Sequence, residues 1–254
     1  MQDIHAKSYR WRRHLARAFG VRLTGDIPER LIATGLPIPL NAKRRDRLAS
    51  IRAAGALFIH IPKNAGTSLA TALYGHTVRH DTMRYYQRVA PDVAALPSIA
   101  VIRDPVDRFL SAWCYARTGG TRHRQVSEPF RETYRGLRTV DDALDHLECR
   151  DNPFAVDHIF RPQSWYITDR AGRIAVTHLV PIDDLDRLTP LLAVRNIAVL
   201  PRLNVSAASG IVPTDMQRAR IRHLYRDDVT LWNDLQAGTA STHLATSART
   251  AKRG

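Results

Sequence analysis

The sequence has few of the features that would place it in a secreted or membrane class. Its two cysteines, Cys114 and Cys149, are too few for a disulfide framework or a cysteine-based zinc site. We expect two free thiols in a reducing compartment, with one disulfide between them as the alternative. Because apolar runs of about 18 residues and a signal-peptide core are both lacking, we expect a cytoplasmic protein without a membrane span.

Acidic residues are also scarce. The chain has 24 Asp and Glu against 38 Lys and Arg, a net charge of +14. Residues 1–54 alone hold 12 basic and 4 acidic residues, and so contribute +8 of that charge. Such a balance favours a polyanionic partner: nucleic acid, anionic lipid, an acidic glycan or a nucleotide with several phosphates. A solvated basic surface is equally compatible with it.

The pattern of apolar residues predicts an α/β fold. Residues 56–61 and 98–102 are short, nearly unbroken apolar runs, typical of strands buried on both faces of a parallel sheet. Weaker strand patterns occur at 173–180 and 196–200. Helices are predicted at 67–75, 105–117, 139–148, 183–194 and 214–236, the last opening with a capping box at Thr214 and Gln217. We expect a P-loop-like three-layer fold, with a central parallel sheet flanked by helices.

Three regions follow from this reading. Residues 1–54 form a basic N-terminal extension, partly helical, residues 55–237 form the main domain, and residues 238–254 form a polar, basic tail that we expect to be disordered. A short basic helix at 8–20 would carry Trp11, Leu15 and Phe19 along one side. It would dock either on the domain or on an anionic membrane surface.

The segment after the first strand has the character of an anion-binding loop. Gly66 would let the backbone approach an anion, and a helix N-terminus begins at this point. Lys63 adds a full positive charge. In a triphosphatase P-loop the lysine follows the glycine, whereas here it precedes Gly66 by three residues, on the strand side of the anion. The predicted loop consists of Lys63, Asn64, Ala65, Gly66, Thr67 and Ser68.

A second candidate site follows the second strand. Arg103 directly follows the run 98–102, Asp104 can cap the next helix, and Pro105 suits the first turn of that helix. Arg103 and Ser111 could together grip a second phosphate, with the guanidinium binding in a bidentate manner. The alternative is that Arg103 pairs with a carboxylate and that Ser111 is a packed helix residue.

Together, "FIHIPKNAGTSL" and "AVIRDPVDRFLSAW" resemble the corresponding motifs of sulfotransferase family 2. The family includes uronyl 2-O-sulfotransferases, chondroitin and dermatan 4-O-sulfotransferases and bacterial relatives, and the resemblance spans roughly residues 55–206. It implies a sulfotransferase that uses 3′-phosphoadenosine 5′-phosphosulfate (PAPS) and sulfates a hydroxyl of a saccharide or glycoconjugate. Lys63 would lie near the oxygen that bridges phosphate and sulfate, and Arg103 and Ser111 would hold the 3′-phosphate.

The resemblance also implies roles for residues outside the two motifs. A histidine between them would be the general base, and we expect His80, with His76 as the alternative. His76, Arg161 and Gln163 would border the cleft on the substrate side, although a structural role for Arg161 is equally compatible. We expect His60 and His158 to pack or to lie at the surface. No metal is expected.

Two other function classes compete with this one. A P-loop nucleotide kinase or phosphotransferase would need a lysine after the loop glycine and a carboxylate for magnesium, and the sequence has neither at the expected place. A basic nucleic-acid-binding protein without catalysis would explain the charge but not the paired motifs. We therefore expect PAPS and a hydroxyl acceptor as partners, no nucleic acid, and a cytoplasmic location or one peripheral to the inner membrane face through the basic N-terminus.

Overall fold

The structure is a computed structural model. It describes residues 11, 13–121, 124–150, 152–193, 195, 197 and 210–238. Apart from residue 197, the strand predicted at 196–200 lies outside the described residues. The tail beyond residue 238 does so as well.

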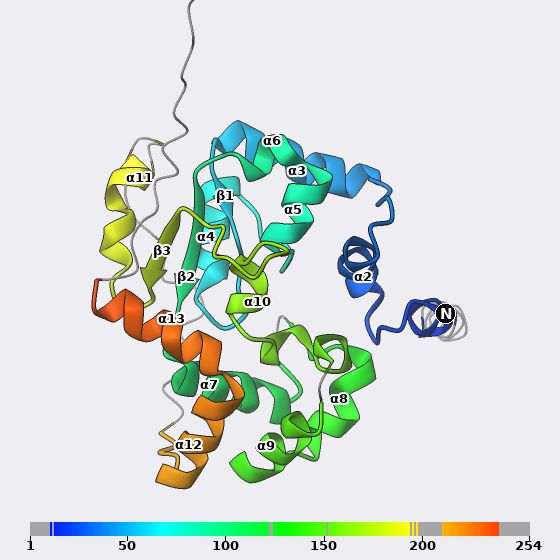
Figure 1. Ribbon diagram of the computed structural model, residues 1–254, viewed down its shortest axis with the longest axis vertical. Helices are drawn as coiled ribbons and strands as arrows, with labels where there is room; N and C mark the ends of the chain where they lie inside the picture. Colours follow the sequence, from blue (N-terminus) through cyan, green and yellow to red (C-terminus); the bar gives the residue numbers. More distant parts are fainter. Residues whose placement is uncertain are drawn as a thin grey trace, which may run out of the picture.

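Three parallel strands form a small open sheet at the centre of the molecule (Figure 1). The strands are β1 (Leu57–Phe58), β2 (Ser98–Ile102) and β3 (His178–Pro181), in the spatial order β1-β2-β3. In the register, Leu57 pairs with Ser98 and Ile99 with His178. The predicted α/β class with a parallel sheet flanked by helices is therefore confirmed, and the arrangement is compatible with three layers.

The helices have the following bounds. They are α2 (Ile27–Ala33), α3 (Ala42–Ala54), α4 (Gly66–Tyr74), α5 (Met83–Val89), α6 (Pro91–Ala94), α7 (Pro105–Arg117), α8 (Glu128–Arg135), α9 (Val140–Glu148), α10 (Ser164–Ile167), α11 (Thr189–Ala193), α12 (Asp215–Leu224) and α13 (Arg226–Gln236). Short 3-10 helices are η1 (Thr24–Asp26), η2 (Pro153–Ala155), η3 (His158–Phe160) and η4 (Leu185–Leu188).

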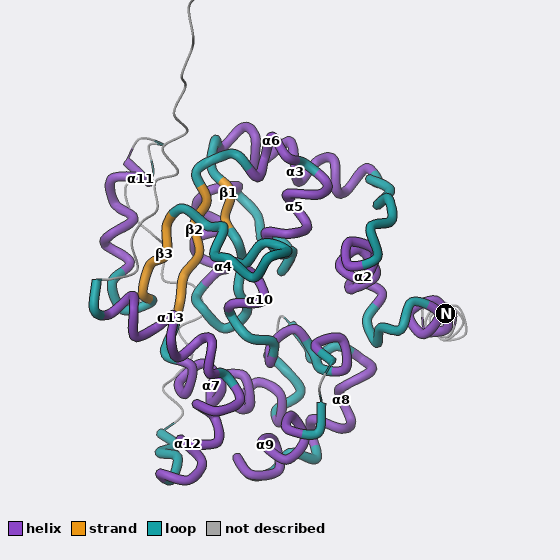
Figure 2. Tube along the Cα trace, in the orientation of Figure 1, coloured by secondary structure: helices purple, strands orange, loops and turns teal. Residues whose placement is uncertain are grey.

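Alternate residues of the strands face two different hydrophobic clusters. On one side, Ala100 and Ile102 of β2 pack with residues of α2, α3, α5, α10 and α13. On the other side, Ile99 and Val101 pack with residues of α4, η4 and α11. Since successive strand residues point to opposite faces, the unbroken apolar run at 98–102 covers both. Figure 2 shows helices on both sides of the strands.

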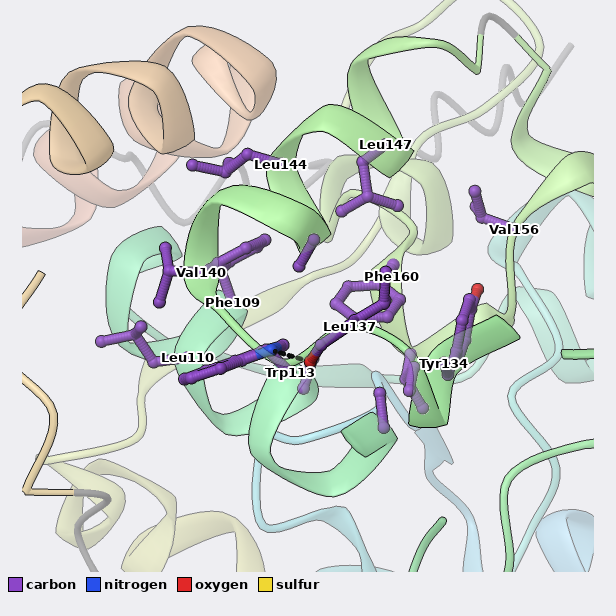
Figure 3. Close-up of a cluster of buried hydrophobic side chains, with 14 of the residues drawn as sticks. Phe109, Leu110, Trp113, Tyr134, Leu137, Val140, Leu144, Leu147, Val156 and Phe160 are labelled. Carbon is purple, nitrogen blue, oxygen red and sulfur yellow. Dashed lines mark hydrogen bonds between the residues drawn. The ribbon is translucent and has the colours of Figure 1, made fainter. Parts of the chain in front are cut away.

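A second body of helices lies below the sheet in Figure 1 and is built around α7, α8, α9 and α12. In its core, drawn in Figure 3, the indole Nε1 of Trp113 donates to the Leu137 carbonyl over 2.9 Å. Phe109 and Tyr134 both pack on Phe160, which directly precedes Arg161. This core therefore fixes the chain that enters the cleft from η3.

Several predicted elements differ in length. β1 is shorter than the predicted strand because the Ile61 amide turns back to the Ile59 carbonyl (3.1 Å), which takes the chain out of the ladder. The predicted strand at 173–180 begins only at His178. The helix predicted at 183–194 is divided into η4 and α11, and the one at 214–236 is broken at Tyr225. The capping box of Thr214 and Gln217 is confirmed.

The N-terminal region packs on the rest of the chain. Residues 13–18 are helical, but the buried side chain is Ala16, which contacts Phe154 in a small cluster. Phe19 packs against the same cluster, whereas Trp11 and Leu15 are exposed, so only part of the predicted apolar side contacts the rest of the chain. Within the described ranges, Cys114 and Cys149 are both free, and no helix combines the length and apolar character that crossing a bilayer requires.

A buried carboxylate joins α13 to the start of α10. Asp228 is fully buried and accepts hydrogen bonds from the amides of Gln163 (2.6 Å) and Ser164 (2.8 Å). Burial raises its pKa, against the opposing effect of Arg108 and the two amides. The orientation of Gln163 therefore depends on a side chain 65 residues away in the sequence.

We expect Asp228→Ala to lower the free energy of unfolding by about 2–3 kcal/mol, because two buried amides lose their acceptor. Urea unfolding would measure the change. The matched control is Asp227→Ala, since Asp227 is exposed and its ion pair with Arg226 is loose at 3.8 Å. That change should stay within about 0.5 kcal/mol. Equal effects of the two substitutions would contradict the anchoring role.

Candidate active site

A cleft of about 1690 Å³ opens at the carboxyl ends of β1 and β2. This is the edge at which parallel α/β sheets bind ligands. Of the predicted loop residues, Lys63, Ala65, Gly66, Thr67 and Ser68 line it, and so does Arg103. The other walls come from η1 and α2, from residues 77–81, 124–127 and 157–161, and from the chain after β3.

The loop after β1 has an unusual backbone. Lys63 and Ala65 have positive φ angles of 70° and 54°, the only such non-glycine residues in the described part of the chain. This left-handed conformation costs about 1–2 kcal/mol per residue, and such strain gathers at functional sites. The turn allows α4 to begin at Gly66. Within the described residues, the Gly66 and Thr67 amides donate no hydrogen bond, whereas the Ser68 amide donates to Ala65 (3.2 Å).

Gly66 also makes room for a histidine ring. A Cβ at this position would lie 2.0 Å from Cδ2 of His60, closer than any real contact. The His60 ring therefore lies against the N-terminus of α4, and it lines the cleft. The sequence suggested a close backbone approach at Gly66, and the structure adds a side chain that uses the same space.

Two amide side chains join the two predicted phosphate motifs. Nδ2 of Asn64 donates to Oε1 of Gln163 (2.6 Å), and the same oxygen accepts from the Arg103 amide (3.0 Å). Nε2 of Gln163 donates to the Arg103 carbonyl (2.8 Å). Neither Asn64 nor Gln163 lines the cleft. Gln163, predicted on the substrate side, therefore holds the loop after β1 and the end of β2 in register.

The Arg103 side chain reaches the backbone of the loop that carries Lys63. The Arg103 guanidinium contacts the Lys63 carbonyl at 3.4 Å, and Nζ of Lys63 lies 4.6 Å from the ring centroid of Tyr115. Burial, helped by the nearby charge of Arg103, lowers the pKa of Lys63 to about 8. A bound anion would relieve this repulsion, so the pair is suited to hold negative charge.

Three imidazoles form a row along the cleft. The ring centroids of His60 and His80 are 4.3 Å apart, and those of His80 and His158 are 4.7 Å apart in a stacked arrangement. Nδ1 of His80 lies 2.7 Å from the His60 carbonyl, which can only accept, so in the neutral ring this nitrogen carries the proton. Nδ1 of His158 lies 2.7 Å from Oδ1 of the buried Asp157.

Burial disfavours positive charge on two of these rings. It lowers the pKa of His60 to about 4, a shift that the His60 Nδ1 contact with the Val78 carbonyl only partly offsets. The pKa of His80 lies well below its usual value, because of burial first and then the neighbouring His60 and His158. Both rings are therefore neutral near pH 7.

Other predicted site residues lie elsewhere. His76 is exposed, lies 3.3 Å from the Ser50 hydroxyl and does not line the cleft. The Ser111 hydroxyl is buried without a hydrogen-bond partner in the described residues, and it is not part of the cleft wall. Arg161 lines the cleft, but its guanidinium forms a bidentate pair with Asp26 (2.8 and 2.5 Å). This geometry favours the structural role for Arg161.

Sequence reasoning missed several residues of the site. Tyr115 was not identified, although it lines the cleft and lies on α7, the helix that directly follows Arg103 and Asp104. Asp157 and His158 adjoin in "VDHIF", which was the available signal for their pairing. In the described residues, no group of three or more His, Cys, Asp or Glu side chains is arranged to hold a metal ion. Neither the models of known protein families nor the curated protein sequences match this chain.

We expect Gly66→Ala to lower the free energy of unfolding by about 1–3 kcal/mol, because the new methyl group must displace the His60 ring. Urea denaturation followed by tryptophan fluorescence would measure the change. Gly25→Ala is the control, because its Cβ would meet only the end of the Arg79 side chain, which can move. An unchanged stability of Gly66→Ala would mean that His60 does not pack on α4.

The low pKa of His60 predicts a pH dependence of stability. Its folded pKa of about 4 lies below the usual 6.5, so protons bind preferentially to the unfolded chain as the pH falls through this range. The stability contributed by neutral His60 is therefore complete above about pH 6.5 and is lost towards pH 4. Glu29 acts in the opposite sense, because burial raises its pKa to about 7. A comparison with a His60 variant removes the Glu29 contribution.

Unfolding of the wild type and His60→Asn should be measured at pH 7.5 and at pH 5. The asparagine keeps a donor for the Val78 carbonyl but cannot be protonated. The stability difference between the two proteins should narrow by about 2 kcal/mol at the lower pH, since each pH unit changes one proton's linkage by about 1.4 kcal/mol. A constant difference would show that His60 titrates normally.

Proposed function

We propose that this protein is a PAPS-dependent O-sulfotransferase with a P-loop-like fold, and that it sulfates a hydroxyl of a saccharide or glycoconjugate. The observation that carries the proposal is the pairing of two cationic motifs at adjacent strand ends. Lys63 and the start of α4 lie after the end of β1, and Arg103 lies at the end of β2. A donor with two separate anionic groups matches two separate cradles.

The chemistry of these residues fits the donor. After the strained turn at Lys63 and Ala65, the Gly66 and Thr67 amides donate no hydrogen bond within the described residues, and the dipole of α4 favours an anion at this helix start. Lys63 would neutralise the charge that grows on the leaving phosphate oxygen as the bond to sulfur breaks. Arg103 would bind the 3′-phosphate. The buried Ser111 hydroxyl would have to rotate or shift to reach it, so its predicted contact is the weaker part of the assignment.

A hydroxyl acceptor needs a base, and the row of histidines supplies neutral imidazoles beside the cradle. His80 was the choice from the sequence, and it lines the cleft, whereas His76 does not. With its proton on Nδ1, the Nε2 atom of His80 is free to accept a proton. The proposed location is cytoplasmic or peripheral to the inner membrane face.

The first test is calorimetric titration with PAP, the desulfated product, beside ADP and ATP without magnesium. We expect a clear preference for PAP, because only PAP carries the 3′-phosphate. Arg103→Ala should weaken PAP binding about 10- to 100-fold while changing ADP binding little, since a hydrogen-bonded charge contributes about 1.5–3 kcal/mol.

The matched control is Arg52→Ala, which removes the same charge from the exposed face of α3, where Arg52 pairs with Asp92. Its PAP affinity should stay within about twofold of the wild type. A preference for ATP would favour a nucleotide kinase instead. A folded protein that binds no nucleotide but binds duplex DNA in a salt-sensitive manner would favour the nucleic-acid-binding alternative.

A further inference from the structure

We propose that the general base of this site is His158, oriented by the buried carboxylate of Asp157, and that His80 is a positioning residue stacked against it. The inference rests on the proposed sulfotransferase function and specifies which histidine takes the acceptor's proton. It replaces the sequence-based choice of His80 and the expectation that His158 is a packing or surface residue.

The first argument is the hydrogen-bonded pair itself. Asp157 is 1% exposed, and its Oδ1 lies 2.7 Å from Nδ1 of His158. Burial by itself would raise the pKa of Asp157, but the charge and hydrogen bond of His158 outweigh it and lower the pKa to about 2. Asp157 is therefore ionised at neutral pH. Because an ionised carboxylate only accepts, Nδ1 of His158 donates to it, so a ring that gives up one proton loses it from Nε2, which then has the lone pair of a base.

The position of the carboxylate is fixed by its surroundings. Oδ1 of Asp157 also accepts a hydrogen bond from the Ile159 amide (3.1 Å). The backbone of Asp157 is held as well, because its amide donates to the buried Tyr134 hydroxyl (2.8 Å). His158 opens η3, and its side chain is 29% exposed. The imidazole therefore stands between a rigid, buried acid and an open cleft, which is the arrangement of a base oriented by a third group.

The second argument compares the two candidate rings. A base becomes positively charged when it takes the proton, so the charges around each ring decide which is better suited. Burial comes first in disfavouring a positive charge on His80, and the neighbouring His60 and His158 add to it, with a smaller contribution from Arg124. Its Nδ1 contacts only a neutral carbonyl. His158 instead contacts a carboxylate, which stabilises the imidazolium as it forms.

Within the described residues, Nε2 of neither His80 nor His158 makes a hydrogen bond, and both residues line the cleft. Access to the cleft therefore does not decide which ring is the base. The contact with the Asp157 carboxylate does, because only His158 has it. His80 contributes a flat surface, stacked at 27° to the His158 ring, that limits the rotation of the imidazole. The row from His60 to His158 begins at the N-terminus of α4 and ends at the hydrogen-bonded pair of His158 and Asp157.

In the proposed step, the acceptor oxygen forms a bond to sulfur while the bond between sulfur and the 5′-phosphate oxygen breaks. The electron pair of the broken bond stays on that phosphate oxygen, beside Lys63. The hydroxyl proton moves to Nε2 of His158, and Asp157 remains ionised. Release of that proton to solvent restores the neutral ring.

The structure offers a matched pair of variants. In both His158→Asn and His80→Asn, the amide nitrogen can replace Nδ1 and keep its hydrogen bond, to Asp157 or to the His60 carbonyl, while the atom that would accept the proton is lost. The probe is radiolabelled PAPS with water as the acceptor, and the readout is the rate of sulfate release. PAP affinity is measured in parallel by calorimetry.

We expect His158→Asn to slow sulfate release about 100-fold or more with PAP affinity within about twofold of the wild type. His80→Asn should slow it less than about tenfold. Asp157→Asn should also lose about 100-fold, because its amide would favour the proton on Nε2 of His158. Added imidazole should restore part of the activity of His158→Asn, which a purely structural defect would not allow.

A nitrogen-resolved NMR spectrum of the histidine rings adds a readout that needs no turnover. We expect the neutral form of the His158 ring to keep its proton on Nδ1 in the wild type and to change tautomer in Asp157→Asn. A loss of sulfate release in His80→Asn but not in His158→Asn would overturn the inference and leave the sulfotransferase proposal standing. A neutral wild-type His158 ring with its proton on Nε2 would also overturn it. Failure of the wild type to bind PAP would instead refute the proposed function.

Discussion

The site depends on one small network of amides, in which Gln163 ties Asn64 to the backbone of Arg103. The sheet brings β1 and β2 side by side, but β1 is only two residues long, and the chain turns away from the ladder at Ile61. The amide network takes over where the ladder stops. Gln163 is in turn held by Asp228 of α13, 65 residues later in the sequence. The positions of Lys63 and Arg103 therefore depend on α13 as well.

The amide network also explains why the charged side chains line the cleft while the groups that hold them are buried. Lys63 and Arg103 present their charges to the cleft, while the groups that hold them are buried: Asn64, Gln163 and Asp228 are each about 1% exposed or less. Buried polar groups are costly unless they are hydrogen-bonded, so such a network holds one arrangement firmly. The cations are thereby pre-positioned for an anion, which would otherwise have to order them on binding.

Much of the fold could be predicted from local pattern. The run 98–102 and the helix that starts at Pro105 have the bounds expected from buried apolar residues and a capping aspartate, and the chain is α/β. The loop residues that line the cleft could also be predicted, since a strand, a glycine and a helix start are local signals. The pairing of Arg161 with Asp26 and of Gln163 with Asn64 could not, because these contacts join residues 135 and 99 positions apart. The choice among histidines likewise depended on a buried neighbour, Asp157, that spacing alone does not reveal.

The pair of Asp26 and Arg161 also bears on how the molecule folds. Residues of η1 and α2 form one wall of the cleft, and this pair fixes that wall to η3. Closing a contact across 135 residues costs chain entropy that nearer contacts must first reduce. The wall can therefore be completed only after the sheet and its helices have brought the two segments together. A chain that is still emerging from the ribosome would therefore have no closed cleft until Arg161 has been synthesised.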